Sequence, residues 1–140
     1  MTDTAYKQAL KLFEKQIECI ISDNREAQFD LFADDVRYEF PFAIDRPRLI
    51  EGREAFRKVM EPLWAEARRR GAQAVGYRSE FHATDEPGLF LAIFDLDVKI
   101  AENTVSLPFI QLIRIQDGHI VAIKEYFNPS ARAAALDADV

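Results

Sequence analysis

The apolar residues in the first half of the chain recur at helical spacing over two long segments. In residues 4–22 they form one stripe, and lysines and glutamates occupy the opposite side, which predicts an amphipathic helix. A second stripe covers residues 53–70, and Gly71 marks its end. Pro62 lies inside this stripe. Because proline removes a backbone donor and clashes with the preceding turn, we expect a kink or a break there.

Two shorter elements lie between these helices. Asp23 and Glu26 have the spacing of a capping box, which predicts a short helix that continues to about Phe32. In residues 36–40 apolar side chains alternate with charged ones, which predicts a strand. Pro41 ends this strand, because proline cannot donate to a sheet ladder.

The second half of the chain has the two-residue period of strands. We predict strands over residues 73–84 and 89–102, joined by an Asp-Glu-Pro-Gly turn. Residues 104–116 and 119–127 form a closing hairpin around an Asp-Gly turn. The alanine-rich tail that follows predicts a short terminal helix.

The closing hairpin carries one polar residue on an otherwise apolar face of each strand. Gln111 is in register with Phe109 and Ile113, and Glu125 is in register with Ile123 and Phe127. A carboxylate in such a row is either turned to water or held in an apolar pocket, where desolvation raises its pKa. The second case is how general acids and bases are made.

The register of this hairpin decides whether the two polar residues meet. A two-residue turn would place Glu125 opposite Ile110, on the face away from Gln111. A three-residue turn with a bulge would place Glu125 opposite Phe109, on the face of Gln111. The functional hypothesis requires the second register.

Composition narrows the classes of function. The 140 residues are 49% hydrophobic and 30% charged, ordinary values that predict a single domain over residues 1–140 with a substantial core. The net charge of −6 argues against nucleic acid and against anionic membranes as partners. The chain has no long uncharged apolar segment and no signal peptide, so we expect a cytoplasmic protein. Eleven phenylalanines suit an apolar cavity.

Several other polar residues have structural interpretations. Asp95 and Asp97 share a strand face, and we interpret them as an exposed ladder with Lys99 and Arg78 rather than as metal ligands, so no metal is expected. His82 shares a face with Arg78 and is a weak acid/base candidate, provided that this face is the inner one.

Two arginines lie near the end of the loop of residues 43–48. Arg46 and Arg48 could together clamp an anionic substrate. Because loops lie on the surface, we favour the interpretation that both are solvated charges.

The order of these elements predicts an α+β fold, because helices precede mostly antiparallel strands. We expect three N-terminal helices to pack on one face of a curved, mixed and mostly antiparallel sheet. The long strands are apolar on both faces and need a second cover. A second copy of the chain could provide it, so we predict a homodimer.

Three segments, taken in order, resemble a known family: LFADDVRYEFPF, IEGREAFR and KEYFNP. They are similar to the SnoaL-like branch of the nuclear-transport-factor-2-like superfamily, which includes ketosteroid isomerases, polyketide cyclases, some dehydratases and the phenazine-biosynthesis A/B proteins. The resemblance implies a cone-shaped fold in which helices pack in a strongly curved sheet around a deep apolar pocket, usually as a homodimer. The superfamily hosts many activities, so each site position has to be compared separately.

The ketosteroid isomerase positions carry other residues here. The general-base Asp corresponds to Phe40, the oxyanion-holding Tyr to Gln16, and the protonated Asp to Gln111. That mechanism is therefore not expected, although both glutamines could donate hydrogen bonds to a ligand carbonyl. In the phenazine A/B resemblance the acid/base Glu corresponds to Glu125, while the helix-three His corresponds to Val59.

Two hypotheses follow. In the first, the protein is an isomerase, cyclase or dehydratase that acts on an apolar, ring-bearing metabolite without a cofactor. Glu125 moves the proton, and Gln111 with Gln16 or Tyr38 holds the oxygen where charge develops. The aromatic residues that shape the pocket are Phe40, Trp64, Phe94 and Phe109. In the second hypothesis, the protein is a non-catalytic ligand-binding or dimerisation module of the same fold.

Overall fold

The computed structural model describes residues 3–137, with four helices and six strands in that range. In chain order they are α1 (Asp3–Ile21), α2 (Arg25–Phe29), β1 (Phe32–Glu39), β2 (Leu49–Glu51), α3 (Arg53–Arg69), β3 (Ala72–Ala83), β4 (Leu89–Ile100), β5 (Asn103–Gln116), β6 (His119–Phe127) and α4 (Pro129–Asp137). No helix in this range is both long and apolar enough to cross a membrane.

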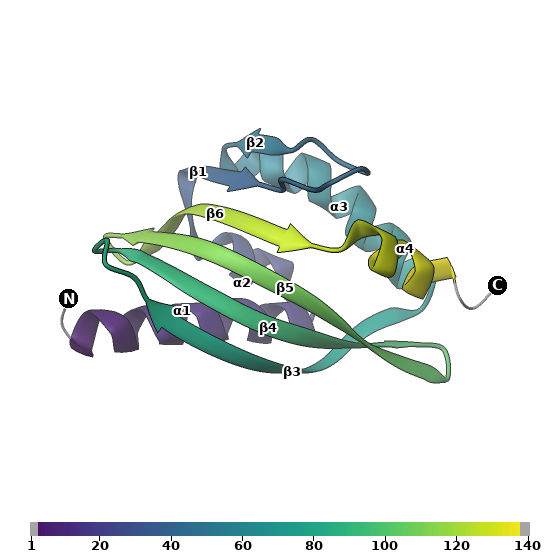
Figure 1. Cartoon of the computed structure of the whole chain (residues 1–140). Helices are drawn as coiled ribbons and strands as arrows, with labels where there is room; N and C mark the ends of the chain where they lie inside the picture. Colours follow the sequence, from purple (N-terminus) through teal and green to yellow (C-terminus); the bar gives the residue numbers. More distant parts are fainter. Residues whose placement is uncertain (1–2, 138–140) are drawn as a thin grey trace.

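The strands form one mixed sheet in the order β2-β1-β6-β5-β4-β3. All neighbours are antiparallel except β1 and β6, which are parallel. Figure 1 shows α1, α2 and α3 behind this sheet and α4 at the end of β6. The α+β prediction is confirmed. The sheet is twisted rather than strongly curled (Figure 1), so the strongly curved cone that the family resemblance implied is not found.

The predicted helices and strands agree with the observed ones except at some boundaries. The second helix is shorter than predicted, and its N-cap is Asn24, whose Oδ1 accepts from the backbone N–H of Ala27 at 3.2 Å. Asp23 instead lies just beyond the end of α1, where its φ of 55° is in the left-handed region that often ends a helix. The helix α3 continues through Pro62, so the expected break is absent. The three-residue strand β2 was missed because it is too short to show a period.

The inner face of the sheet and the three helices enclose an aromatic core. Along β4, every second side chain from Phe90 to Ile100 is buried, as the alternation predicted. Phe13 of α1 packs on this face, with its ring centroid 5.4 Å from those of both Phe81 and Phe94. Burying whole aromatic side chains is the dominant stabilising contribution in a domain of this size.

The outer face of the sheet carries the predicted charged ladder. Arg78 on β3 lies 2.9 Å from Asp97 and 3.8 Å from Asp95 on β4. The predicted pairing of the two aspartates with Arg78 is confirmed, whereas no ion pair between Lys99 and either aspartate is found among the described residues. His82 lies on this face as well, with its side chain 53% exposed and 3.6 Å from Glu80. His82 therefore does not face the interior, and its candidacy as an acid or base in the pocket is withdrawn.

The closing hairpin adopts neither of the two predicted registers. Asp117 and Gly118 both have positive φ, 52° and 78°, as a two-residue type I′ turn requires, and Gln116 pairs with His119. The register then shifts between Arg114 and Ile115, because β6 contains one extra residue, Val121.

Beyond this bulge, Glu125 lies directly opposite Gln111. The turn is thus that of the first predicted register, and the shared face is that of the second. A one-residue bulge turns every later side chain of the strand to the other face. The two polar residues therefore meet, as the functional hypothesis requires.

Candidate functional site

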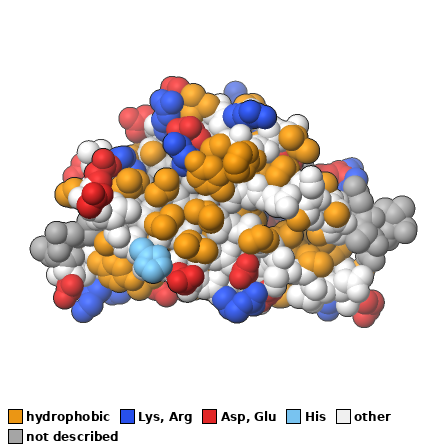
Figure 2. All heavy atoms as spheres, viewed as in Figure 1, with side chains coloured by type: hydrophobic (Ala, Val, Ile, Leu, Met, Phe, Trp, Pro, Cys, Tyr) orange, Lys and Arg blue, Asp and Glu red, His pale blue; other side chains and the backbone are white. Residues whose placement is uncertain are grey.

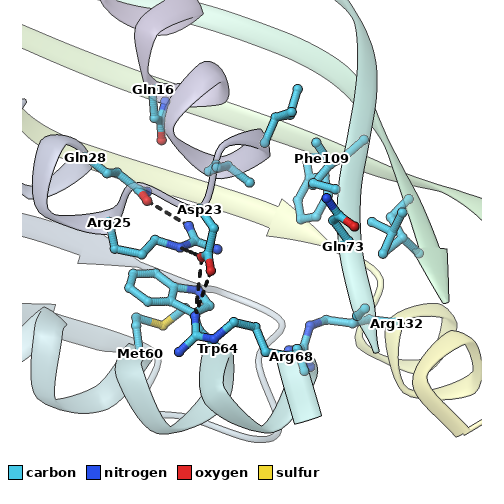
Figure 3. Close-up of a pocket in the computed structure, with 18 of the residues that line it drawn as sticks. Gln16, Asp23, Arg25, Gln28, Met60, Trp64, Arg68, Gln73, Phe109 and Arg132 are labelled. Atoms are coloured by element: carbon cyan, nitrogen blue, oxygen red, sulfur yellow. Dashed lines mark hydrogen bonds and ion pairs between the residues drawn. The ribbon is translucent and has the colours of Figure 1, made fainter. Parts of the chain in front are cut away.

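A cavity of about 530 Å³ lies between the three helices and the inner face of the sheet. Figure 3 shows part of its lining, with side chains that come from helices on one side and from strands on the other. Seven of the eight residues predicted for the site line it: Gln16, Tyr38, Trp64, Phe94, Phe109, Gln111 and Glu125. The structure brings these side chains together, and their roles in binding or catalysis stay predictions.

The eighth residue, Phe40, does not line the cavity. Its side chain is fully buried and stacks on Tyr38 with ring centroids 4.6 Å apart. Phe40 faces inward as its strand period predicted, and two residues that line the cavity, Tyr38 and Arg46, pack on its ring. Its place in the fold is to support Tyr38.

Glu125 is held by two hydrogen bonds on one oxygen. Nε2 of Gln111 donates to Oε1 at 2.6 Å, and the hydroxyl of Tyr38 donates to the same oxygen at 2.9 Å. These donors come from β5 and β1, the two strands that flank β6. Within the described residues no hydrogen bond reaches the second oxygen, Oε2. One oxygen therefore fixes the carboxyl group, and the other is free to exchange a proton with a ligand in the cavity.

The surroundings of Glu125 favour its protonated form. Burial removes water from the carboxyl group and raises its pKa above the ordinary value of 4.5. The hydrogen bonds from Gln111 and Tyr38, together with the positive charges of Arg46 and Arg132, act in the opposite direction. Desolvation is the largest contribution, so the pKa of Glu125 is raised. A raised pKa brings a carboxyl group closer to the range in which it can work as an acid and a base near neutrality.

Gln111 links Glu125 to a second buried amide. Nε2 of Gln16 on α1 donates to Oε1 of Gln111 at 3.2 Å, and both side chains are at most 1% exposed. Gln111 thus accepts on one side and donates to Glu125 on the other. The expected role of Gln111 and Tyr38 was to hold a ligand oxygen, whereas here both donate to Glu125 and orient it.

Arg46 was expected in solvent, and this expectation is wrong. Its side chain is only 4% exposed, and the guanidinium lies over the rings of Phe40 and Phe127 at 4.8 and 5.1 Å. Nε and Nη2 donate to the carboxylate of Asp45 at 2.8 and 3.0 Å. The aromatic rings and the aspartate together stabilise the buried cation. Arg48 of the same loop is exposed, as predicted.

Three further arginines of the lining were not predicted. Arg132 on α4 donates to Asp45 at 3.2 Å. The guanidinium of Arg25 lies 4.0 Å from the ring centroid of Trp64, and Arg68 donates to Asp23 at 3.3 Å, as Figure 3 shows. No local pattern marks these residues, because each comes from a helix end whose basic residues are expected to be solvated.

The described residues contain no group of three or more His, Cys, Asp or Glu side chains that could hold a metal ion. The polar groups of the cavity are instead amides, arginines, a tyrosine and carboxylates. This set can orient a polar ligand and move a proton.

Solved structures with a similar fold come from several bacteria. A Bacillus subtilis protein described as a candidate isomerase matches with a TM-score of 0.76 and 19% identity, over 93% of this chain and 91% of that chain. A candidate polyketide cyclase from Xanthomonas campestris pv. campestris matches with a TM-score of 0.71 and 17% identity, over 95% and 99%. An LEH-like epoxide hydrolase from M. tuberculosis matches with a TM-score of 0.63 and 16% identity, over 94% and 90%.

At these identities the similarity establishes the fold and leaves the reaction open. Among curated proteins, no sequence matches this chain. A family model described as a SnoaL-like domain matches residues 13–123, which include α3 and the hairpin up to Ile123. This match covers most of the sequence, and the chain therefore belongs to the SnoaL-like domain family.

Proposed function

We propose that this protein is an enzyme that performs acid/base chemistry on a small, ring-bearing metabolite, with Glu125 as the group that moves the proton. The observation that carries this proposal is the state of one carboxyl group. Glu125 lines the cavity and is fixed through Oε1 by Gln111 and Tyr38, while Oε2 accepts no hydrogen bond from the described part of the chain. Its raised pKa fits a group that accepts a proton and returns it.

The proposed step is a proton transfer at a carbon next to a carbonyl group. The Oε2 atom of ionised Glu125 takes the proton, and the electron pair of the C–H bond moves toward the substrate oxygen. Negative charge thus leaves Glu125 and develops on the substrate, where an N–H donor stabilises it. Gln16, which keeps a second N–H on Nε2, is the proposed donor. Returning the proton at another carbon atom gives isomerisation, and passing it to a neighbouring hydroxyl group, which leaves with its bonding electron pair as water, gives dehydration.

A non-catalytic ligand-binding module is the second candidate. It is favoured by the fact that Tyr38 and Gln111, two expected donors to a substrate oxygen, both donate to Glu125 instead. Under this alternative the carboxyl group would only recognise a polar ligand atom.

The substitution Glu125→Gln separates the two candidates. Metabolites that raise the melting temperature of the wild-type protein are identified first, because a ligand that binds the folded state stabilises it whether or not it reacts. We expect Glu125→Gln to abolish turnover of such a ligand and to keep much of the thermal shift. The matched control is Glu80→Gln, which changes an exposed glutamate on the outer face of the sheet. Turnover that survives Glu125→Gln would refute the proposal, and binding without turnover by the wild-type protein would favour the second candidate.

We also propose that a second copy of the chain covers the outer face of the sheet. Ile93 pairs with Ile110, and Ile110 pairs with Tyr126, so these residues form one row across β4, β5 and β6. Phe42 extends the row, with its ring centroid 5.5 Å from that of Tyr126. Ile93, Ile110 and Phe42 are 37, 41 and 60% exposed, and Figure 2 shows hydrophobic side chains across this face. A contiguous apolar surface of this kind favours burial against a partner.

The oligomeric state tests this proposal. Ile110→Lys places a charge in the middle of the row, and we expect it to convert a dimer into a folded monomer. Light scattering after gel filtration measures the mass directly. A wild-type monomer would refute the proposed dimer, and so would an unchanged dimer of Ile110→Lys.

A further inference from the structure

The lining of the cavity carries a charge opposite to that of the protein. The whole chain has a formal net charge of −6. The described residues of the lining nevertheless include four arginines and only two carboxylates, and no lysine or histidine. The arginines are Arg25, Arg46, Arg68 and Arg132, and the carboxylates are those of Asp23 and Glu125. An excess of positive charge on low-dielectric walls attracts anions.

The positive charge is buried where Arg46 and Arg132 share one aspartate. Asp45 accepts from Nε and Nη2 of Arg46 and from Nη1 of Arg132. Their side chains are only 4 and 25% exposed. Two guanidinium groups thus hydrogen-bond to a single carboxylate, and Glu125 is a second carboxyl group that interacts electrostatically with both. Burying a charge without a full counter-charge is unfavourable.

One donor of this pair has no oxygen acceptor among residues 3–137. Nη1 of Arg46 lies 3.6 Å from Sδ of Met60, and a thioether sulfur is a weak acceptor. Met60 itself lines the cavity, so this nitrogen lies at the cavity wall. A ligand oxygen at that position would be a better partner than the sulfur. Arg46 and Arg132 already donate to one carboxylate, that of Asp45, so a ligand carboxylate has the chemistry that this pair binds.

We propose that the cavity binds an organic acid, whose carboxylate contacts Arg46 and Arg132 and whose apolar ring lies against Trp64 and Phe109. An organic acid is a narrower ligand class than the ring-bearing metabolite of the proposed function. Binding of the acid is measured without turnover, so only the statement that the acid is a substrate rests on the proposed function. Arg46 and Arg132 also act electrostatically on Glu125. A ligand carboxylate bound to these two arginines therefore lies near Glu125, and the ionised form of Glu125 repels it.

The test compares an acid with its uncharged amide. Trp64 is the only tryptophan of the chain and lines the cavity, so its fluorescence reports occupancy. The probes are 3-phenylpropionate and 3-phenylpropionamide, which have the same ring and differ in charge. We expect the acid to bind about ten-fold more tightly than the amide, because a hydrogen bond to a charged group contributes more than a neutral one.

Three variants locate the carboxylate. Arg132→Gln changes a partly exposed side chain, and we expect it to weaken binding of the acid by about ten-fold and to leave binding of the amide within two-fold. Arg46→Lys keeps the charge but loses the Nη1 donor beside Met60, and we expect a smaller loss of acid binding than in Arg132→Gln. The matched control is Arg48→Gln, which lies in the same loop as Arg46 and outside the cavity lining and should bind both probes as the wild type does.

The variant Glu125→Gln distinguishes this inference from the proposed function. It removes a negative charge next to the two arginines, and we expect it to bind the acid more tightly than the wild type does. Equal binding of acid and amide, no saturation by the acid at millimolar concentration, or unchanged acid binding in both Arg132→Gln and Glu125→Gln would overturn the inference. Loss of turnover in Glu125→Gln would at the same time support the catalytic role of Glu125, whichever ligand proves to bind.

Discussion

Glu125→Gln should make the protein more stable at neutral pH, although it changes a residue at the centre of a hydrogen-bond network. The side-chain amide can keep its Oε1 as acceptor for Gln111 and Tyr38. Its Nε2 replaces Oε2, which accepts no hydrogen bond from any described residue. The substitution therefore removes the charge and keeps the shape, so that its effect on stability reports the cost of burying that charge.

The sign and the size of the effect follow from proton linkage. The pKa of Glu125 is raised in the folded state, mainly by desolvation, so between pH 4.5 and the folded pKa the native protein holds a proton that the unfolded chain has lost. The free energy of unfolding of the wild type then falls as the pH rises, by at most about 1.4 kcal/mol per pH unit for one proton. Below pH 4.5 this contribution is fully present, and above the folded pKa it is fully lost. Glu125→Gln has no such proton to lose.

Urea denaturation between pH 4 and pH 8, followed by the fluorescence of Trp64, measures this difference. We expect the two proteins to have similar unfolding free energies near pH 4 and Glu125→Gln to be more stable at pH 7. The control Glu80→Gln alters a carboxylate whose side chain is 68% exposed and should follow the wild-type curve. A difference between wild type and Glu125→Gln that stays constant with pH, or a less stable variant at pH 7, would show that the carboxyl group is not held in a desolvated site.

Three further outcomes follow from the same contacts. Tyr38→Phe removes a donor that lowers the pKa of Glu125, so an NMR titration of the carboxyl carbon of Glu125 should show a higher pKa than in the wild type, and a lower one would contradict this role. Gln111→Met leaves Gln16 and Glu125 without their shared partner and should reduce the free energy of unfolding by about 1–3 kcal/mol in urea, with an unchanged value as the contrary result. Gly118→Ala adds a methyl group with no atom within 4 Å at a φ of +78°, so only backbone strain of about 1 kcal/mol should appear, and a much larger loss would mean that the turn also makes contacts.

The elements of the fold could be predicted from the sequence because each has a strong local period. The alternation along β4 and the apolar stripe of α3 specify which side chains are buried whatever the partners are. The pairing of β1 with β6 has no local signature, because parallel strands that are distant in the chain depend on the whole sheet. The N-cap is Asn24 instead of Asp23, since two adjacent residues of this sequence can both cap a helix and the local pattern does not decide between them.

The polar residues of the site also differ in whether the sequence predicts them. Gln111 and Glu125 stand out in the sequence, since each interrupts an apolar strand face that has to be buried, whereas Gln16 was identified only through the family resemblance. Arg46 and Arg132 do not stand out, because a charge in a loop or at a helix end is usually solvated. Only the folded chain shows that Asp45 and the rings of Phe40 and Phe127 stabilise Arg46 in the interior.

The bulge at Val121 determines both the pairing of β6 and the direction of the Glu125 side chain. Without it, the two-residue turn at Gly118 would direct Glu125 outward, and the carboxyl group would lie on the face away from Gln111. At the bulge β6 also meets β1, where Ile120 pairs with Phe32 and Ala122 pairs with Arg37. The extra residue lets β6 satisfy a tight turn on one side and a parallel partner on the other. The inward face of Glu125 is thus a consequence of how three strands fit together, and for this reason the period of β6 alone could not determine it.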